Sequence, residues 1–280
     1  MTPSASPDRY AVMGNPVSHS QSPAIHTLFA KQTGQHIHYE AILVETTAFT
    51  QAVETFKQQG GRGLNITVPF KQEAWTLATQ RSTRAELAGA VNTLSFSDGQ
   101  ILGDNTDGVG LVRDLQHQLG IDLQGQKILI LGAGGAVRGV LHPLLEQKPE
   151  RIVIANRTAS KAEQLAELFS STGNISGMGL ESIPPIAFDL IINGTAASLQ
   201  GDVPAISSGS IDSHTCVYDM MYAPQPTAFM QWASQSGATL CVDGLGMLVE
   251  QAAESFYIWR QVRPDTGPVI RKIREQMQAG

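Results

Sequence analysis

A glycine-rich segment in the middle of the chain has the residue types and spacing of a dinucleotide site. Residues 127–131 (KILIL) are typical of a strand buried on both faces, and residues 132–136 (GAGGA) lead from it into a predicted helix. Glycine suits this turn because a pyrophosphate can then approach the N–H groups at the helix start. A tight turn without a ligand is the alternative interpretation. The residues predicted to contact the cofactor are Gly132, Ala133, Gly134, Gly135 and Ala136.

One position in this segment departs from the common dinucleotide fingerprint. Val137 stands where a third Gly or Ala is usual, and that small residue normally allows the helix to pack closely on the strand. We therefore expect the helix to lie slightly farther from the strand than in the commonest version.

The end of the next predicted strand favours NADP over NAD. Asn156, Arg157 and Thr158 begin 22 residues after Gly134, where NAD-binding proteins place an Asp or Glu for the ribose 2′-hydroxyl. A guanidinium can contact a phosphate with two hydrogen bonds, whereas a carboxylate would repel it. We therefore predict that these three residues bind NADP. The alternative is a solvated Arg157, with Thr158 capping the following helix.

Three polar segments outside this region are candidates for binding a substrate. They are residues 18–23 (SHSQSP), residues 65–71 (NITVPFK), and Asn92 together with residues 103–108 (GDNTDG). Hydroxyl groups in the first segment could bind a carboxylate or sugar-like hydroxyls, although Ser-Pro is also a common start of a helix.

Lys71 and Asp107 lie in two of these segments and could support the reduction of a ketone. The reaction needs a hydride at the carbon and a proton at the oxygen, and a lysine beside a carboxylate can supply that proton or stabilise the alkoxide. The residue types alone do not establish such a pair, because exposed Lys and Asp side chains are usually solvated.

The elements that must position these residues follow a β–α rhythm. In the first third, strands are predicted at 10–13, 37–44 and 63–67, and Asp98-Gly99 is a hairpin signal between two further strands. From residue 127 onward, apolar runs separated by helix-length segments indicate a parallel sheet. These runs are residues 127–131, 152–155, 189–192, 216–220 and 239–242.

We predict an α/β fold with two domains. Residues 1–106 and 244–280 form an α/β substrate-binding and catalytic domain, to which the C-terminal helices return. Residues 107–243 form an NADP-binding domain with a Rossmann-type, doubly wound parallel sheet.

Composition and charge exclude several other classes of protein. Hydrophobic residues make up 42% of the 280 residues and the formal net charge is −6, which is ordinary for a globular protein and lacks the basic face of a nucleic-acid binder. Residues 1–9 contain no apolar core, so we expect neither a signal peptide nor a membrane anchor, and a soluble, cytoplasmic protein. Two cysteines and scattered histidines predict no disulfide framework and no metal site. We expect a monomer or a homodimer.

The polar segments, taken in order along the chain, resemble the signatures of the shikimate dehydrogenase family. The resemblance extends from about residue 10 to the C-terminal helices. The matching segments are residues 14–23 (GNPVSHSQSP), 65–71 (NITVPFK), 89–93 (GAVNT), 103–108 (GDNTDG), 132–136 (GAGGA), 156–158 (NRT), 218–224 (YDMMYAP) and 243–252 (DGLGMLVEQA).

This resemblance implies the reversible reduction of 3-dehydroshikimate to shikimate by NADPH, within the biosynthesis of aromatic amino acids. It implies that Lys71 and Asp107 are the catalytic pair, and that Thr195 and Gly244 contact the cofactor. The residues implied to hold the carboxylate and hydroxyls of the substrate are Ser20, Ser22, Thr67, Asn92, Tyr222 and Gln251. Residues 193–198 (NGTAAS) depart from the family pattern, which usually has Asn-Ala-Thr-Ser, so we expect a modest change in cofactor affinity.

Three alternative functions remain open at this point. A related enzyme could oxidise quinate as well as shikimate, or mainly quinate, and could use NAD, although Arg157 disfavours NAD. A tetrahydrofolate dehydrogenase would share the two-domain plan but not the serine-rich segment. A non-catalytic NADP sensor would have no need for both Lys71 and Asp107.

Overall fold

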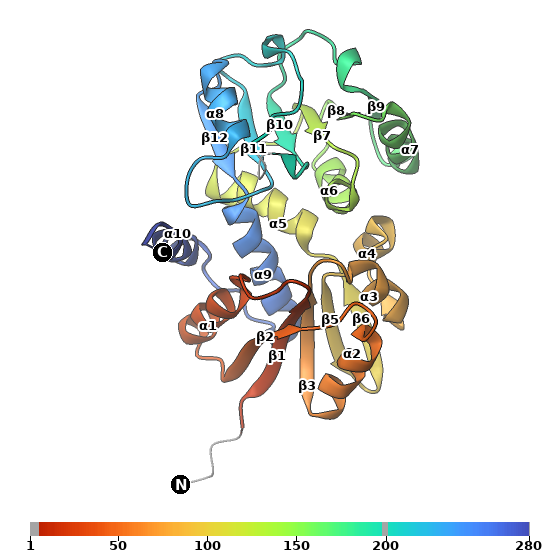
Figure 1. Cartoon of the computed structure of the whole chain (residues 1–280), viewed down its shortest axis with the longest axis vertical. Coiled ribbons are helices and arrows are strands. Elements are labelled where there is room, and N and C mark those ends of the chain that lie inside the picture. Colours follow the sequence, from red (N-terminus) through yellow and green to blue (C-terminus); the bar gives the residue numbers. More distant parts are fainter. Residues whose placement is uncertain (1–5, 198–200, 280) are drawn as a thin grey trace. The chain divides into compact units, whose positions relative to one another are not determined.

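The first strand, β1 (Asp8–Gly14), carries apolar side chains on both of its faces, so its sheet is covered on both sides. In the computed structural model, which describes residues 6–197 and 201–279, this sheet belongs to the first of two compact units (Figure 1). The first unit consists of the chain up to Gly110 together with Val249–Ile273, and the second of Leu111–Leu248 with the residues from Arg274 onward.

The first unit contains a mixed sheet of six strands in the order β2-β1-β3-β5-β6-β4. The strands β2, β1 and β3 are parallel, and β5 runs antiparallel between β3 and β6. The remaining strands of the sheet are β2 (Ile37–Leu43), β3 (Gly61–Ile66), β4 (Gln80–Arg81), β5 (Thr93–Ser97) and β6 (Gln100–Asp104). The helices that lie wholly within this unit are α1 (Ser22–Thr33), α2 (Phe49–Gln58), α3 (Lys71–Leu77) and α4 (Thr83–Ala88).

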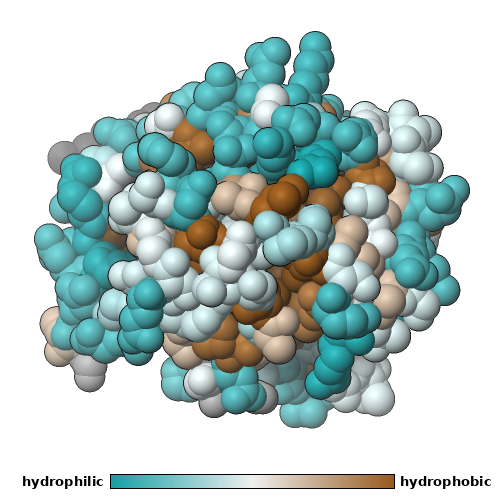
Figure 2. All heavy atoms as spheres, turned by 90° about the horizontal axis from the view of Figure 1, so that it is seen from above, coloured by the Kyte–Doolittle hydropathy of each residue, from teal (hydrophilic) through white to brown (hydrophobic). Residues whose placement is uncertain are grey.

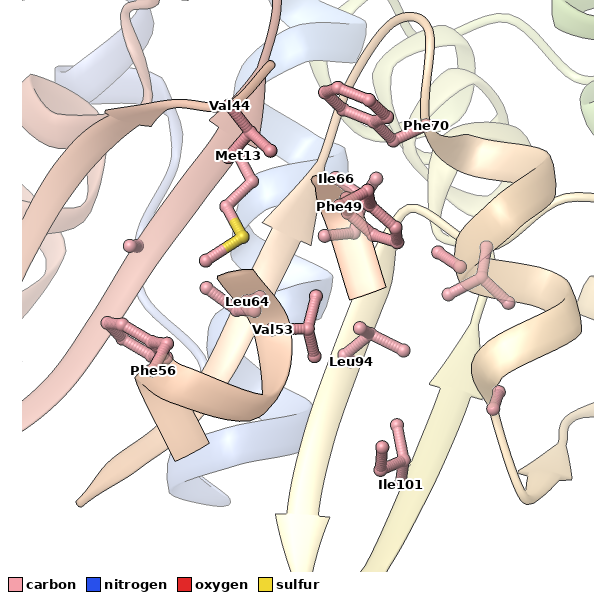
Figure 3. Packing of buried hydrophobic residues seen from close by; sticks show 14 of the residues in the cluster. Met13, Val44, Phe49, Val53, Phe56, Leu64, Ile66, Phe70, Leu94 and Ile101 are labelled. Carbon is pink, nitrogen blue, oxygen red and sulfur yellow. The ribbon is translucent and has the colours of Figure 1, made fainter. Parts of the chain in front are cut away.

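Side chains that alternate along β1 build two separate cores in the first unit. Ala11 and Met13 point into a cluster in which Phe49, Val53 and Phe56 of α2 cover the sheet (Figure 3). Tyr10 and Val12 point to the opposite face, where they pack with Tyr39 and Trp259. Burying a side chain such as Phe49 contributes about 1.5–3 kcal/mol to stability, so these three side chains of α2 are a substantial part of this core.

The hairpin predicted around Asp98-Gly99 is confirmed. Strands β5 and β6 pair in antiparallel register, with Ser97 opposite Gln100. Asp98 and Gly99 both have positive φ angles, of 49° and 79°, which match the twist of a two-residue hairpin turn.

The second unit contains a sheet of six strands in the order β12-β11-β10-β7-β8-β9, and all neighbouring strands are parallel. Read from β9, this is the 3-2-1-4-5-6 order of the doubly wound dinucleotide fold, so the predicted fold class is confirmed. The strands are β7 (Lys127–Leu131), β8 (Arg151–Asn156), β9 (Ile175–Gly179), β10 (Leu190–Asn193), β11 (Cys216–Asp219) and β12 (Leu240–Asp243).

Helices connect the strands of the second unit and lead out of it. They are α5 (Asp107–Arg113), which continues as a π-helical turn at Asp114–Gln118, α6 (Gly135–Glu146), α7 (Ala159–Phe169), α8 (Ala228–Gln235), α9 (Leu245–Arg260) and α10 (Gly267–Ala279). Short 3-10 turns occur at Leu180–Ser182 and Ser208–Ser210. The chain passes from one unit to the other within α5, α9 and α10.

Lys71 is the first residue of α3, two residues after Pro69, and Gly267 and Pro268 lie in the first turn of α10. The two compact units divide after residues 110, 248 and 273. Residues 1–5, Ser198 and Gly280, which enter the sequence predictions, lie outside the described residues.

The surface carries scattered apolar residues. On the face shown in Figure 2, hydrophobic residues lie in interrupted groups bordered by hydrophilic ones. The most exposed large hydrophobic side chains are Leu43, Val68 and Leu168. Within the described residues, no helix combines the length and apolar character needed to cross a membrane.

Candidate active site

The polar segments of the first unit meet at one end of its sheet. Strands β1, β3 and β6 end there, and the antiparallel β5 begins there. Two backbone hydrogen bonds join the end of β1, shortly before residues 18–23, to the second segment: Thr67 N–H donates to Met13 O, and Asn15 N–H donates to Val68 O, both at 3.0 Å. Gly14 allows this approach, because an added Cβ would lie 2.3 Å from Thr67 Cγ2.

Lys71 and Asp107, which are 36 residues apart, form an ion pair at this end of the sheet. Lys71 Nζ donates to Asp107 Oδ2 at 2.6 Å, and the two side chains are 31% and 15% exposed. Lys71 begins α3 and Asp107 begins α5, so each is fixed at the start of a helix. The pair is partly shielded from water and still open on one side, as a group that transfers a proton to a bound molecule must be.

Asn92 holds the second oxygen of the Asp107 carboxylate. Its Nδ2 donates to Asp107 Oδ1 at 2.8 Å and to Thr106 Oγ1 at 2.9 Å, while its Oδ1 accepts from Thr106 N–H at 2.9 Å. Asn105 supports the same turn, since its Oδ1 accepts from Asp107 N–H and its Nδ2 donates to Ala90 O. Asn92 is only 3% exposed, so in this arrangement it positions Asp107.

The other predicted substrate residues of the first unit surround the same end of the sheet. Ser22 begins α1 and its N–H donates to Ser20 Oγ at 3.3 Å. Thr67 follows β3 and is half-buried. Gln251 reaches the polar cluster from α9, where its Oε1 lies 3.4 Å from Asn92 Nδ2 and from Thr106 Oγ1. Gly110 lets α9 approach, because an added Cβ would lie 2.7 Å from Gln251 Cβ.

Tyr222 belongs to the second unit, in the segment after β11. It is half-buried, and burial raises the pKa of its hydroxyl, with Asp243 adding to the rise. At neutral pH the side chain is therefore a neutral hydroxyl that can donate and accept hydrogen bonds.

The glycine-rich turn of the second unit offers open backbone at the start of α6. Gly134 precedes the first helical residue, Gly135, and among the described residues no side chain caps the helix. A Cβ added to either glycine would meet nothing within 4 Å, so both face open space. Gly132 has a φ angle of 103°, which other residues rarely adopt. A pyrophosphate fits this turn, because it needs unobstructed N–H groups at a helix N-terminus.

The two departures from family patterns compensate for each other. Val137 is fully buried in the first turn of α6, and a Cβ added to Gly194 would lie 2.4 Å from Val137 Cγ2. Gly194 stands where the family pattern usually has alanine, so the missing Cβ provides the room for the larger residue at 137. The larger separation between α6 and its strand stays a prediction.

Asn156 is the last residue of β8, and Arg157 and Thr158 follow the strand. Arg157 and Thr158 are exposed, and Asn156 Nδ2 donates to Thr158 O at 2.9 Å, which shapes the turn. Thr158 precedes α7, but its side chain makes no capping hydrogen bond among the described residues, so its hydroxyl is not engaged by the helix.

The buried carboxylate of Asp219 connects the loops after β10 and β11 by hydrogen bonds. Thr195 donates from both its N–H and its hydroxyl to Asn193 Oδ1, at 3.1 and 2.7 Å. Asn193 Nδ2 in turn donates to Asp219 Oδ1 at 3.1 Å, and Thr227 Oγ1 donates to Asp219 Oδ2 at 2.6 Å. Gly244 lies against β11, because an added Cβ would be 2.3 Å from Met220 O. Asp219 was not singled out from the sequence, although it lies inside the 218–224 motif.

The histidines and acidic residues form no metal centre in the described ranges 6–197 and 201–279, where no three His, Cys, Asp or Glu side chains cluster. His26 is fully buried and stacks on Tyr39, with ring centroids 4.2 Å apart. Burial lowers its pKa to about 3, so it is a neutral core residue.

Comparison with known proteins identifies the family. Three family models match in chain order: the shikimate dehydrogenase substrate binding domain over residues 12–94, shikimate / quinate 5-dehydrogenase over residues 114–200, and the shikimate 5'-dehydrogenase C-terminal domain over residues 244–274. The shikimate dehydrogenase (NADP(+)) of Cellvibrio japonicus is 55% identical over 271 residues, which cover 96% of this chain and 98% of the relative. The chain belongs to the shikimate dehydrogenase family.

Two solved structures extend the similarity of this shikimate dehydrogenase family member to three dimensions. The Ael1 enzyme of Pseudomonas putida has a TM-score of 0.90 at 44% identity, covering 95% of this chain and 97% of its own. Shikimate 5-dehydrogenase of Thermus thermophilus, solved in complex with NADP(H) and shikimate, has a TM-score of 0.85 at 31% identity, covering 96% and 99%. The family resemblance expected from the ordered motifs is confirmed.

Proposed function

We propose that this protein catalyses the reversible, NADPH-dependent reduction of 3-dehydroshikimate to shikimate in aromatic amino-acid biosynthesis. The observation that carries the proposal is the ion pair between Lys71 and Asp107, at the end of the sheet where the serine-rich segment, Thr67 and Gln251 also lie. Full-length relatives of the same family are NADP-dependent shikimate dehydrogenases by name. A non-catalytic sensor would not need the pair.

In the proposed reaction, Lys71 and Asp107 act as one acid–base unit. When bound, NADPH supplies the hydride. The proton shared by Lys71 Nζ and Asp107 Oδ2 is delivered to the carbonyl oxygen, and the ammonium group stabilises the developing alkoxide. Asn92 keeps the carboxylate oriented toward Lys71 by occupying Asp107 Oδ1.

The substrate is held, in this proposal, by hydroxyl and amide groups. Ser20, Ser22 and Thr67 bind the carboxylate, while Gln251 and Tyr222 hydrogen-bond the ring hydroxyls, with Asn92 beside Asp107. Small neutral donors suit this substrate, because each carboxylate or hydroxyl oxygen needs a hydrogen bond once it leaves water.

The cofactor is NADP, held by the second unit. Gly132, Ala133, Gly134, Gly135 and Ala136 would accommodate the pyrophosphate. Asn156, Arg157 and Thr158 would bind the 2′-phosphate, and Thr195 and Gly244 would lie along the nicotinamide half. The exposed guanidinium of Arg157 is suited to a phosphate at the protein surface.

Domain roles, assembly and location complete the proposal. Residues 1–106 and 244–280 would form the substrate-binding and catalytic domain, and residues 107–243 the NADP-binding domain. We propose a cytoplasmic monomer or homodimer that binds neither nucleic acid nor membrane.

The experiment that tests the function is the absorbance at 340 nm of purified protein with shikimate and NADP⁺, repeated with quinate and with NAD⁺. Formation of NADPH with shikimate alone supports the proposal. Comparable turnover of quinate would assign the protein to a broader quinate and shikimate specificity. Absence of turnover in every combination, by folded protein that still binds NADP⁺, would refute the proposal and favour a sensor.

The role of the ion pair is tested by Lys71→Ala. We expect kcat to fall by roughly 10²–10⁴-fold, the usual contribution of a general acid–base group. Lys57→Ala is the matched control in the same unit, because Lys57 Nζ contacts the Gly99 carbonyl on the surface. A Lys71→Ala enzyme that binds both ligands and turns over like the wild type would remove Lys71 from the mechanism.

A further inference from the structure

A buried serine on α9 lies behind the candidate catalytic pair and joins the elements that carry it. Ser255 is 0% exposed. Its Oγ lies 3.0 Å from Asn65 Nδ2 of β3, 2.7 Å from Thr93 Oγ1 of β5 and 3.3 Å from Thr106 Oγ1 before α5. It also lies 3.1 Å from the carbonyl oxygen of Gln251, one turn earlier in its own helix. One hydroxyl therefore contacts four polar atoms from four segments of the chain.

The donors and acceptors in this cluster restrict how it can be arranged. An amide NH₂ group only donates, so the Ser255 oxygen accepts from Asn65. The single Ser255 proton is then shared among Thr93, Thr106 and the Gln251 carbonyl. Each of the two threonine hydroxyls must in turn find an acceptor, and Asn92 Oδ1 is close to both, at 2.9 Å from Thr93 Oγ1 and 3.2 Å from Thr106 Oγ1.

The cluster continues from Ser255 to the ion pair through two residues. Thr106 Oγ1 contacts Ser255 on one side and accepts from Asn92 Nδ2 on the other. The same Asn92 amide donates to Asp107 Oδ1, and Asp107 Oδ2 holds Lys71. Thr93 provides a second route, since its Oγ1 contacts both Ser255 Oγ and Asn92 Oδ1. Ser255 does not touch the pair itself, and both routes from it to Asp107 pass through Asn92.

We propose that Ser255 is a positioning residue for the reaction, which fixes the orientation of Asn92 and thereby of the Asp107 carboxylate. The inference rests on the proposed function.

Removing the hydroxyl takes one hydrogen-bond partner from each of three buried polar side chains, those of Asn65, Thr93 and Thr106. In Ser255→Ala, Asn65 Nδ2 loses an acceptor and the hydroxyls of Thr93 and Thr106 compete for Asn92 Oδ1. When the Asn92 amide turns toward those hydroxyls, the hydrogen bond from its Nδ2 to Asp107 Oδ1 weakens. We expect kcat to fall on the order of tenfold, with a shifted pH profile of kcat and an unchanged KM for NADP⁺.

The test compares Ser255→Ala with Ser210→Ala in shikimate oxidation, after circular dichroism has established that both variants are folded. Ser210 is the matched control: it is also 0% exposed, and its hydroxyl has no hydrogen-bond partner among the described residues of the chain. Ser210→Ala should keep the wild-type kcat and pH profile. If Ser255→Ala does not fold, the test uses Ser255→Cys instead. Cysteine has a similar shape and keeps a weak hydrogen-bond donor, so this variant should lower kcat severalfold.

A double-mutant cycle with Asn92→Ala separates positioning from general destabilisation. If Ser255 acts through Asn92, adding Ser255→Ala to Asn92→Ala lowers kcat by less than twofold. A folded Ser255 variant with the kcat and pH profile of the wild type would overturn the inference, as would a full, independent loss in the Asn92→Ala background. Failure of the proposed function gives a different result, in which the wild type itself does not oxidise shikimate.

Discussion

Gly194→Ala should destabilise the second unit unless Val137 is shortened at the same time. The new Cβ would lie 2.4 Å from Val137 Cγ2 and 3.3 Å from Met220 Sδ, whereas carbon atoms in ordinary contact are about 3.5–4.0 Å apart. The φ angle of Gly194 is not among the positive ones, so the clash is purely steric. Overpacking of this kind costs about 1–3 kcal/mol.

Shortening Val137 alone should also destabilise the second unit. Val137→Ala removes two fully buried methyl groups, which at about 0.8 kcal/mol for each group plus a small cavity amounts to about 2 kcal/mol. In the double variant the new Cβ of residue 194 fills the space that the valine leaves. The double variant should therefore be no less stable than Val137→Ala alone, which implies a coupling free energy of about 1–3 kcal/mol.

The assay is urea denaturation of the wild type, both single variants and the double variant, with the KM for NADP⁺ measured in parallel. Because Gly194 precedes Thr195 and Val137 lies in the first turn of α6, we expect Gly194→Ala to raise this KM severalfold and the double variant to restore it. Effects on unfolding that add to within about 0.5 kcal/mol would refute the reasoning, since independent sites behave in that way.

Three further predictions concern a buried histidine, the cofactor phosphate and a buried carboxylate. The pKa of His26, about 3 in the folded protein, lies below its ordinary 6.5, so its contribution to stability is complete above pH 6.5 and is lost as the pH falls toward 3. Urea denaturation at pH 7 and pH 5 should show the wild type losing about 2 kcal/mol more than His26→Phe, and equal losses would argue against a buried neutral imidazole. Arg157→Ala should raise the KM for NADP⁺ at least tenfold and leave the KM for NAD⁺ unchanged in steady-state assays; a parallel rise in both would exclude a phosphate contact. Asp219→Ala should lower the free energy of unfolding by more than about 3 kcal/mol, because Asn193 and Thr227 lose a buried acceptor, and a near-neutral result in denaturation would show that water replaces the carboxylate.

Local pattern in the sequence was sufficient for much of the fold. The apolar run at 127–131 with its following glycines predicts β7 and the start of α6, because a buried strand and a tight turn each impose a short-range requirement on residue type. Asp98-Gly99 predicts the hairpin for the same reason. Boundaries such as the start of α3 were less predictable, since Pro69 is compatible with a loop as well as with a first helical turn.

The site depends on contacts that no local pattern contains. Lys71 and Asp107 meet because β3 and β6 both finish at the same end of a mixed sheet. The order of the strands in that sheet is decided by long-range packing. Ser255 was not recognisable as a site residue, because a serine inside a helix gives no signal of its own, and only the fold brings Asn65, Thr93 and Thr106 around it. The sequence by itself determined which residue types are present and in what order. The tertiary structure decided which of them share a proton, because hydrogen bonds and steric contacts act over a few ångströms between atoms that the chain alone leaves far apart.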